Sequence, residues 1–280
     1  MKKHIVAIVG IAIGVLIIVS CKGLSTSTNT MSTDSVTISK ETLADTTYFK
    51  LTSGGKCDII ANATFCYPKA YRDAKATEAL HSLFIINVLE LADTIEFDQS
   101  FKKYIAGVLH QYGISENERP EDVEDDYESV YQYASNTTIS PVYNKNGVLT
   151  FCKADFTTKN GKQTMSTHRY SNFDLEQMKL IEFNDLFIDS STDDLTMLIK
   201  SNLMKQLNAK TEDDVINMGY FNLDNLKPTT NFSIGTDGIT WTYLPYEIAL
   251  LSVGETNITV KYDELEMLMQ DNDLVARIKH

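Results

Sequence analysis

Histidine, cysteine, aromatic and acidic side chains are the groups in this sequence that could act on, or bind, another molecule. The five histidines show no His-x-x-x-His or comparable spacing, so the sequence predicts no metal site. There is no Gly-x-Ser-x-Gly turn around a nucleophile, and no glycine loop for a phosphate group. We therefore expect neither a metal nor a cofactor, and we favour a non-catalytic protein over an enzyme.

The candidate binding residues lie in the second half of the chain. His168 is on an expected strand, where it either recognises a partner or makes a structural hydrogen bond. Trp241 and Tyr243 share one face of another strand; exposed, they would stack on sugars, and buried, they would fill the core. Glu247 follows a tyrosine at an expected turn, where it either contacts a ligand or caps the backbone. We expect the structural alternative in each case. The full candidate set is His168, Tyr170, Trp241, Tyr246 and Glu247.

The elements that must position these side chains indicate an α+β fold with antiparallel sheets and packed helices. Apolar residues alternate with polar ones from Cys57 to Phe65, which predicts a half-buried strand that Tyr67-Pro68 ends. A helical period follows over 74–92, and a second runs from Phe97 to Leu109. These helices need only core contacts to explain their apolar stripes.

A β-meander and a smaller set of strands follow. Asn146-Gly147 and Asn160-Gly161 predict hairpin turns, because the type I′ turn needs positive φ at both central positions. Ser191 or Thr192 is the expected N-cap of the next helix. The last third predicts strands at 232–234, 239–243 and 256–260, then a short helix over 262–270. We expect two subdomains in one globular unit, at 48–140 and 141–280.

The N-terminus indicates export. Lys2 and Lys3 precede an uncharged apolar stretch that is too short for a spanning helix. Its end, Ile18-Val19-Ser20-Cys21, resembles the lipobox of bacterial lipoproteins. The resemblance implies that residues 1–20 are a signal peptide and that Cys21 receives a diacylglycerol; the alternative is an uncleaved signal anchor. Ser- and Thr-rich residues 21–47 predict a flexible tether.

Charge constrains the partners. The chain has 25 Lys and Arg against 38 Asp and Glu, a net charge of −13, so we expect no nucleic-acid partner. Removing Lys2 and Lys3 with the signal changes −13 to −15, so the lipid rather than a basic patch must hold the protein at a membrane. The acidic run Glu116–Glu128 lacks calcium-loop spacing, and we expect a solvated segment there.

Three cysteines remain after Cys21. Cys57 and Cys66 lie at opposite ends of one expected strand, too far apart for a disulfide. Cys57 and Cys152 both lie on apolar strand faces and could meet. We expect three buried free thiols rather than that bond.

A family resemblance enters at the C-terminal end. Asn231-Phe232-Ser233-Ile234, Pro245-Tyr246-Glu247-Ile248-Ala249 and Tyr262-Asp263-Glu264-Leu265 resemble the extracytoplasmic domain of the RsiV-type, lysozyme-sensing anti-sigma factors. A related domain accompanies the catalytic domain of PdaC-type peptidoglycan deacetylases. The resemblance covers roughly residues 48–270.

The resemblance implies a binding module in the cell envelope of a bacterium, where short segments such as Asp45-Thr46-Thr47 resemble the O-glycosylation sequon of Bacteroidota. Only Met1–His4 precede the apolar stretch, so we do not expect a sigma-binding segment. The expected protein is lipid-anchored, faces the periplasm or the outside, and binds a peptidoglycan fragment or a lysozyme-like protein. The alternatives are a peptidoglycan-acting enzyme that uses Glu247 and His168, or a structural envelope protein.

The lipid anchor gives the first prediction. Cys21→Ala removes the thiol that would carry the lipid, so the chain should stay an uncleaved precursor that migrates more slowly on a denaturing gel. Metabolic labelling with a fatty acid checks the same point. Label that persists in Cys21→Ala would contradict the assignment.

Overall fold

The structure, a computed structural model, describes residues 35–50, 56–112, 132–221, 223 and 226–280. The chain divides into two units, Met1–Met31 and Ser32–His280, and all described residues belong to the second. The predicted signal peptide, Cys21 and the acidic run Glu116–Glu128 lie outside the described residues. No helix in the described ranges is long and apolar enough to cross a membrane.

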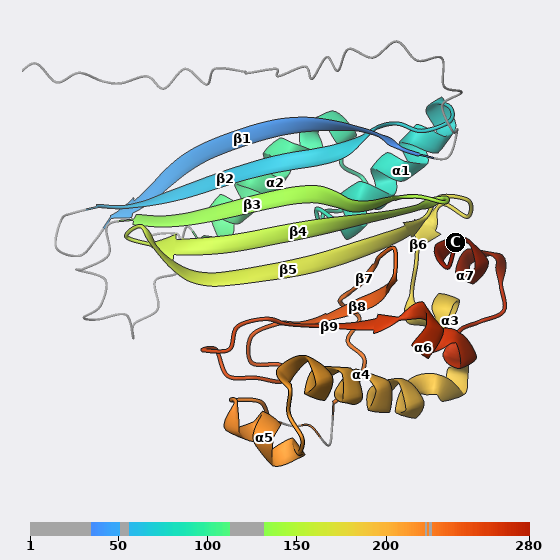
Figure 1. The fold of residues 1–280 in the computed structure, drawn as a ribbon. Coiled ribbons are helices and arrows are strands. Elements are labelled where there is room, and N and C mark those ends of the chain that lie inside the picture. The colour runs from blue at the N-terminus through green and yellow to red at the C-terminus, as the bar shows by residue number, and fades with distance from the viewer. Residues whose placement is uncertain (1–34, 51–55, 113–131, 222, 224–225) are drawn as a thin grey trace, which may run out of the picture. The chain divides into compact units, whose positions relative to one another are not determined.

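A long sheet forms the first half of the folded unit, with its strands in chain order (Figure 1). Neighbouring strands are antiparallel except β2 and β3, which run parallel because α1 and α2 lie between them in the sequence. The strands are β1 (Thr37–Lys50), β2 (Lys56–Ala70), β3 (Gln132–Lys145), β4 (Val148–Lys159), β5 (Lys162–Asp174) and β6 (Lys179–Leu180).

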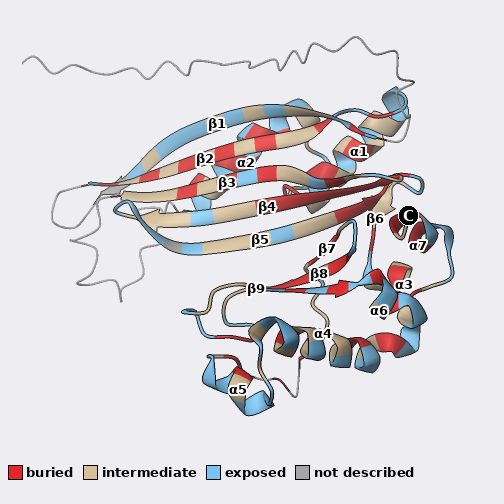
Figure 2. Ribbon diagram, in the orientation of Figure 1, coloured by how far each residue is buried: buried red, intermediate tan, exposed pale blue. Residues whose placement is uncertain are grey.

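Helices α1 (Ala74–Asn87) and α2 (Phe97–Tyr112) cover one face of this sheet. Alternate residues of β2 are buried against them, as a strand with one covered face requires (Figure 2). Phe65 lies at the centre of the contact, stacked on Phe101 with ring centroids 4.5 Å apart and edge-on to Tyr104 at 5.6 Å. The apolar stripes predicted for both helices are therefore core-facing, as expected.

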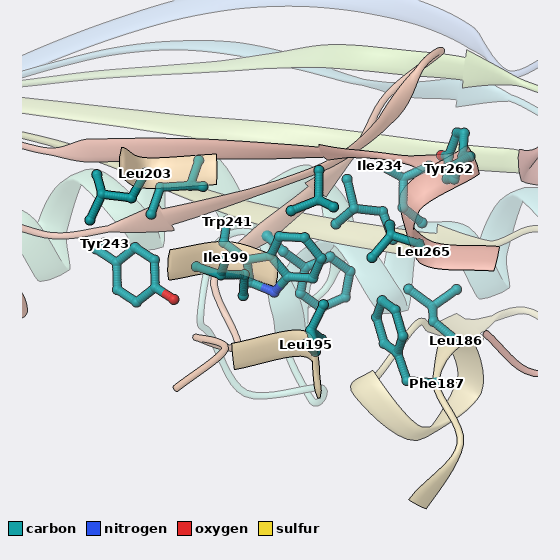
Figure 3. Close-up of a cluster of buried hydrophobic side chains, with 14 of the residues drawn as sticks. Leu186, Phe187, Leu195, Ile199, Leu203, Ile234, Trp241, Tyr243, Tyr262 and Leu265 are labelled. Carbon is teal, nitrogen blue, oxygen red and sulfur yellow. The ribbon is translucent and has the colours of Figure 1, made fainter. Parts of the chain in front are cut away.

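A second sheet carries the other core. It comprises β7 (Phe232–Ile234), β8 (Gly238–Tyr243) and β9 (Thr256–Lys261), all antiparallel. Trp241 is fully buried between this sheet and α4 (Thr192–Leu207), where Leu195, Ile199 and Leu203 line the helix face (Figure 3). Short helices surround it: α3 (Phe183–Leu186), α5 (Glu212–Asn217), α6 (Tyr262–Leu265) and α7 (Asp273–Ile278).

The two sheets meet along β5, and a buried asparagine joins them. The Asn172 side-chain amide donates to the Phe232 carbonyl at 2.8 Å. Its oxygen accepts from the Ile234 backbone N–H at 3.0 Å and from the Thr150 hydroxyl at 2.9 Å. The side chain thus replaces the backbone ladder that a continuous sheet would provide.

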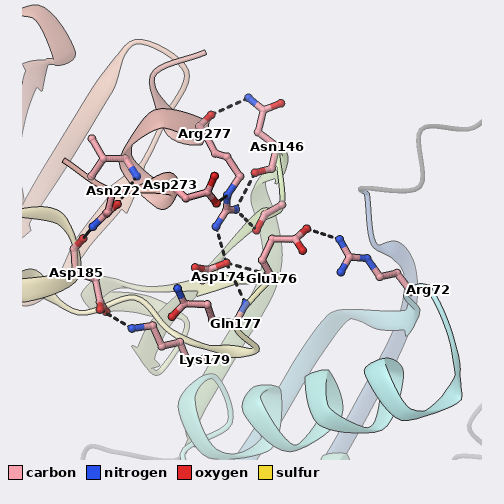
Figure 4. Close-up of polar contacts among 12 residues, drawn as sticks. Arg72, Asn146, Asp174, Glu176, Gln177, Lys179, Asp185, Asn272, Asp273 and Arg277 are labelled. Carbon is pink, nitrogen blue, oxygen red and sulfur yellow. Dashed lines mark hydrogen bonds and ion pairs between the residues drawn. The ribbon is translucent and has the colours of Figure 1, made fainter. Parts of the chain in front are cut away.

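An arginine near the C-terminus fastens the last helix to the β3–β4 hairpin (Figure 4). Arg277 donates to the Asn146 and Gly147 carbonyls, both at 3.0 Å, and to the fully buried Asp174 carboxylate at 2.8 Å. Both charges are largely withdrawn from water, so each depends on the other. A Cβ on Gly147 would lie 2.7 Å from the guanidinium, which favours glycine at that turn.

Several sequence predictions are confirmed. Both expected helices are present at α1 and α2, and Asn146-Gly147 and Asn160-Gly161 have positive φ at both residues. The mixed α+β class is also confirmed. Ser191 precedes α4 as expected, but its hydroxyl makes no capping bond because a 3-10 turn enters the helix there.

Three predicted boundaries are wrong. Residues 37–47 are not a tether: they form most of β1, which pairs with β2 along its whole length. The outer edge of β1 has no partner strand in the sheet, and apolar and polar residues alternate only weakly along it. Its composition therefore resembled that of a tether. The strand β2 continues past Tyr67-Pro68 to Ala70. A subdomain boundary at 140/141 would cut β3, and the long sheet runs across it.

The Asn172 junction yields a stability prediction. Asn172→Leu leaves the Ile234 N–H and the Phe232 carbonyl buried without their partner, which should lower the free energy of unfolding by about 2–5 kcal/mol. Urea denaturation of residues 32–280 measures it. Asn87→Leu is the matched control, because the Asn87 amide donates only within its own helix, to Leu83, and should cost less than about 1 kcal/mol. Equal losses for both variants would contradict the role given to Asn172.

Candidate functional site

An open groove lies between the start of β5 and the loop of residues 244–255 that joins β8 to β9. Its volume is about 300 Å³. Its walls are Gln163, Met165, Ser166, Pro245, Leu251, Gly254 and Glu255. A second hollow beside α5 contains Asp214, but that carboxylate already caps the helix by accepting the Lys210 and Thr211 N–H groups. The groove at β5 is therefore the better candidate site.

The loop that forms one wall is held by its own backbone and side chains. The Tyr246 N–H donates to the Ala249 carbonyl at 3.1 Å, and the Leu250 N–H donates to Gly219 at 2.9 Å. The Glu247 carboxylate accepts the Leu244 N–H at 2.7 Å. The capping role expected for Glu247 is confirmed, and the loop is built rather than loose.

Tyr246 stands out within this loop. Its φ is +71°, a left-handed conformation that costs a non-glycine residue roughly 1 kcal/mol or more. Its side chain is 63% exposed, so packing within the fold does not offset that cost. Exposure leaves Tyr246 available to a partner; its binding role stays a prediction.

His168 and Glu255 form a polar pair at the end of the groove. Glu255 accepts the His168 backbone N–H at 2.5 Å, and its other oxygen lies 2.6 Å from the ring Nδ1. The Glu255 side chain is nearly buried, whereas the imidazole is about two-fifths exposed. The structural hydrogen bond expected for His168 is thus present, and a ligand contact through its exposed part stays a prediction.

Tyr170 lies two residues further along β5, away from the groove wall. Its backbone N–H donates to the Asn231 side chain at 2.9 Å, and its hydroxyl neighbours the Cys152 thiol and Thr242. Burial first, then the Cys152 and Glu255 groups, raises the pKa of Tyr170 to about 12. Tyr170 is therefore neutral near pH 7 and acts as a hydrogen-bonding, half-buried neighbour of the site.

Trp241 is excluded as a binding residue. It has no exposed surface, and its ring lies 6.0 Å from that of Phe187 in the second core (Figure 3). Tyr243 is buried beside it, with its hydroxyl donating to the Lys227 carbonyl. The core alternative for this pair is confirmed, and the sugar-stacking alternative is wrong.

The groove also has residues that the sequence did not indicate. Met165 and Leu251 line it and are about half exposed, at 51% and 47%. The run Ile248-Ala249-Leu250-Leu251 was a signal that could have found Leu251, because it places apolar residues in a turn-rich segment. Glu255 gave no signal, since only the fold brings it to His168 across 87 positions.

The acidic side chains at the site already have partners. Both Glu255 oxygens are engaged by His168, and Glu247 is engaged by its own turn. Within the described ranges, no three His, Cys, Asp or Glu side chains gather closely enough to hold a metal ion. The groove therefore offers a mixed surface, with Met165, Pro245 and Leu251 beside Gln163, Ser166 and Glu255.

Comparison with known proteins finds a domain family that part of the chain matches. Residues 184–263 match the family described as "Protein of unknown function (DUF3298)". This segment begins in α3, ends in α6, and contains the second sheet and the loop of the groove. A search of curated proteins finds no match.

Two solved structures share the fold. A member of the DUF3298 family from Bacteroides fragilis NCTC 9343 is 21% identical with a TM-score of 0.71, covering 88% of this chain and 99% of its own. A DUF3298 family protein from Pseudomonas aeruginosa PAO1 is 12% identical with a TM-score of 0.51, covering 85% and 97%. At these identities the likeness concerns the fold alone. It extends over both sheets, well beyond the matched domain.

The three thiols of the folded unit give a prediction of reactivity. Cys57, Cys66 and Cys152 are all free, but Cys66 is half-buried rather than buried as expected. Burial raises the pKa of Cys152 to about 11, so little thiolate forms there at pH 8. In residues 32–280, Ellman's reagent should react quickly with one thiol and slowly with two. Cys66→Ser should remove the fast phase, whereas three equal fast phases would contradict the burial of Cys57 and Cys152.

Proposed function

We propose that this protein is a lipid-anchored lipoprotein of the bacterial envelope whose folded unit is a non-catalytic binding module for a lysozyme-like protein. The proposal includes a relation of the folded unit to the extracytoplasmic domains of RsiV-type and PdaC-type proteins. The observation that carries it is the gathering of exposed apolar side chains at the groove between β5 and the loop 244–255.

The composition of that surface suits a protein partner. Met165 and Leu251, each about half exposed, line the open groove, and the 63% exposed Tyr246 follows the groove residue Pro245 in the chain. Tyrosine and methionine are enriched at the centres of protein interfaces, where charged residues are depleted. Exposed apolar groups that cluster, unlike scattered ones, favour a role in recognition.

The rigidity of the loop supports the same function. Its turn is fixed by the Glu247 carboxylate and by the Gly219–Leu250 hydrogen bond, and its end by the His168–Glu255 pair. A surface that is already ordered loses less conformational entropy on binding. The strained backbone of Tyr246 is a cost that contact with a partner would offset.

Electrostatics favour a basic partner. The chain carries a net charge of −13, which becomes −15 when the two lysines of the signal are removed. C-type lysozymes are strongly basic, and opposite charge speeds association. Salt should weaken this attraction, since the screening length is about 10 Å at 0.1 M.

The enzyme alternative has less support. It would use His168 and Glu247 as acid and base, yet each is engaged by a different structural partner, Glu255 and the Leu244 N–H. A general acid and base must converge on one reacting group. Their present contacts serve the loop and the strand instead.

Capture of hen lysozyme by immobilised residues 32–280 tests the proposal. Leu251→Ser and Tyr246→Ala remove apolar surface at the groove and should each weaken binding about tenfold or more, measured by biolayer interferometry. Met267→Ser is the matched control: Met267 is 85% exposed but lies beyond the far end of β9, and its loss should leave the affinity within twofold.

Cytochrome c, a basic protein of similar size, controls for charge alone. Equal capture of cytochrome c and lysozyme, or equal loss in the groove variants and Met267→Ser, would overturn the proposal. All variants keep the net charge, so a difference between them reports contact rather than attraction.

A further inference from the structure

The long sheet has a face that no described element covers. Helices α1 and α2 pack on the side of Phe65. On the opposite side β5 contacts the second sheet through β7, and the β3–β4 hairpin end packs into the second core with Tyr143 and Val148, which leaves the rest of that side of β1–β4 uncovered by described elements (Figure 1). We call the side of β1–β4 that carries Thr42, Thr64 and Thr138 the open face. These residues lie in one row across three strands, and the row continues to Ala154 on β4.

The open face carries fewer charged side chains than we expect of a surface exposed to water. Between the row of Lys40 and the row of Asp58, no side chain on this face of β1–β4 carries a charge. Soluble designed proteins are given surfaces that are about 25–35% charged, and 22% of this whole chain is Asp, Glu, Lys or Arg. A face that served only solubility would carry charges, as the rest of the chain does.

Hydroxyl and amide groups take their place. The Thr42 and Thr64 hydroxyls lie 3.2 Å apart, and the Asn62 amide donates to Asn136 at 3.0 Å. Each of these groups has both donor and acceptor capacity, and one bond does not exhaust it. The strands that carry them stand about 4.8 Å apart, so the polar groups repeat at about the length of one sugar ring.

The composition of the face decides between possible partners. An acidic polymer would call for lysine or arginine, and the interior of the face has neither. A protein interface would be rich in aromatic, methionine and arginine side chains, whereas between the rows of Lys40 and Asp58 the large apolar residues are Phe156 and Ile60, with the exposed Tyr48 at the margin beside Asp58. Groups that both donate and accept, beside the exposed rings of Phe156 and Tyr48, fit a ligand made of hydroxyls.

We propose that the open face of β1–β4 binds an uncharged, hydroxyl-rich polysaccharide, laid across the strands along the rows of Thr42–Thr64–Thr138 and Asn62–Asn136. Phe156, 39% exposed and opposite Asn136 on β4, provides a ring for a sugar to stack on. The inference does not rest on the proposed protein partner, which would use the groove between β5 and the loop 244–255.

Affinity electrophoresis of residues 32–280 tests the inference, because migration slows in a gel that contains a bound polymer. Hydroxyethylcellulose and glycol chitin are the neutral probes, and alginate is the acidic one. We expect retardation by at least one neutral polymer and none by alginate. No retardation by either neutral polymer, or equal retardation by alginate, would overturn the proposal.

Two matched pairs of variants locate the site. Thr138→Lys puts a charge on the open face, and Thr259→Lys puts the same charge on an exposed threonine of β9. Asn136→Asp and Asn257→Asp form the second pair with the opposite charge. Both open-face variants should lose at least tenfold in affinity and both β9 variants should keep it, with unchanged melting temperatures.

A loss that followed the sign of the charge, or that was equal on both sheets, would overturn the assignment. Lysozyme capture on the same variants separates the two proposals. Open-face variants that retain lysozyme but lose polysaccharide support this inference, whatever the groove variants show. Thr138→Lys that loses lysozyme while no polymer binds would make the face a protein surface and overturn it.

Discussion

The outer edge of β5 is the constraint on which the rest of this fold depends. One side of β5 pairs with β4, but β6 reaches only its last two residues, which leaves most backbone groups of the other edge without a strand. Buried or half-buried backbone groups must find partners. Here the partners come from elsewhere in the chain. Glu255 accepts the His168 N–H, and the Asn231 side chain accepts the Tyr170 N–H and donates to the His168 carbonyl. The Ile181 N–H donates to the Asn172 carbonyl.

These contacts explain why the second sheet sits where it does. Asn172 projects from β5 and bonds the Phe232 and Ile234 backbone, while Asn231 reaches back to β5 and also holds the Thr242 carbonyl. The side-chain amides of Asn172 and Asn231 thus supply hydrogen bonds that a neighbouring strand would otherwise supply. Arg277 closes the other end of the junction on Asp174 and the Asn146-Gly147 turn (Figure 4).

The groove is a consequence of the same edge. The contacts that cover the outer edge of β5 begin at His168. The part of β5 before His168, which includes Met165 and Ser166, faces the loop 244–255 across open space. Glu255 marks the transition, because it belongs to the loop and bonds the strand. The open face of β1–β4 adjoins the groove, because Phe156 on β4 pairs with Ser166 of the groove wall on β5.

The sequence alone determined the local elements. Apolar alternation in β2, the helical period of α1 and α2, and the Asn-Gly turns were all readable, because each depends on neighbours within a few residues. It also indicated that Trp241 belongs to a core and that Glu247 caps a turn. An edge strand such as β1 was missed, since only half of its surroundings are protein and its composition is that of a loop.

Only the tertiary structure decided the pairings that make the sites. The His168–Glu255 pair spans 87 positions, and Asn172 meets Ile234 across 62. The residues that flank a carboxylate or amide in the sequence do not indicate which strand edge it will hydrogen-bond. The parallel register of β2 and β3, which brings Thr64 beside Thr138 and Asn62 beside Asn136, is likewise set by the helices between them. Long-range contacts are chosen by the packing of whole elements, and a periodic pattern in the sequence records only which face of each element is buried.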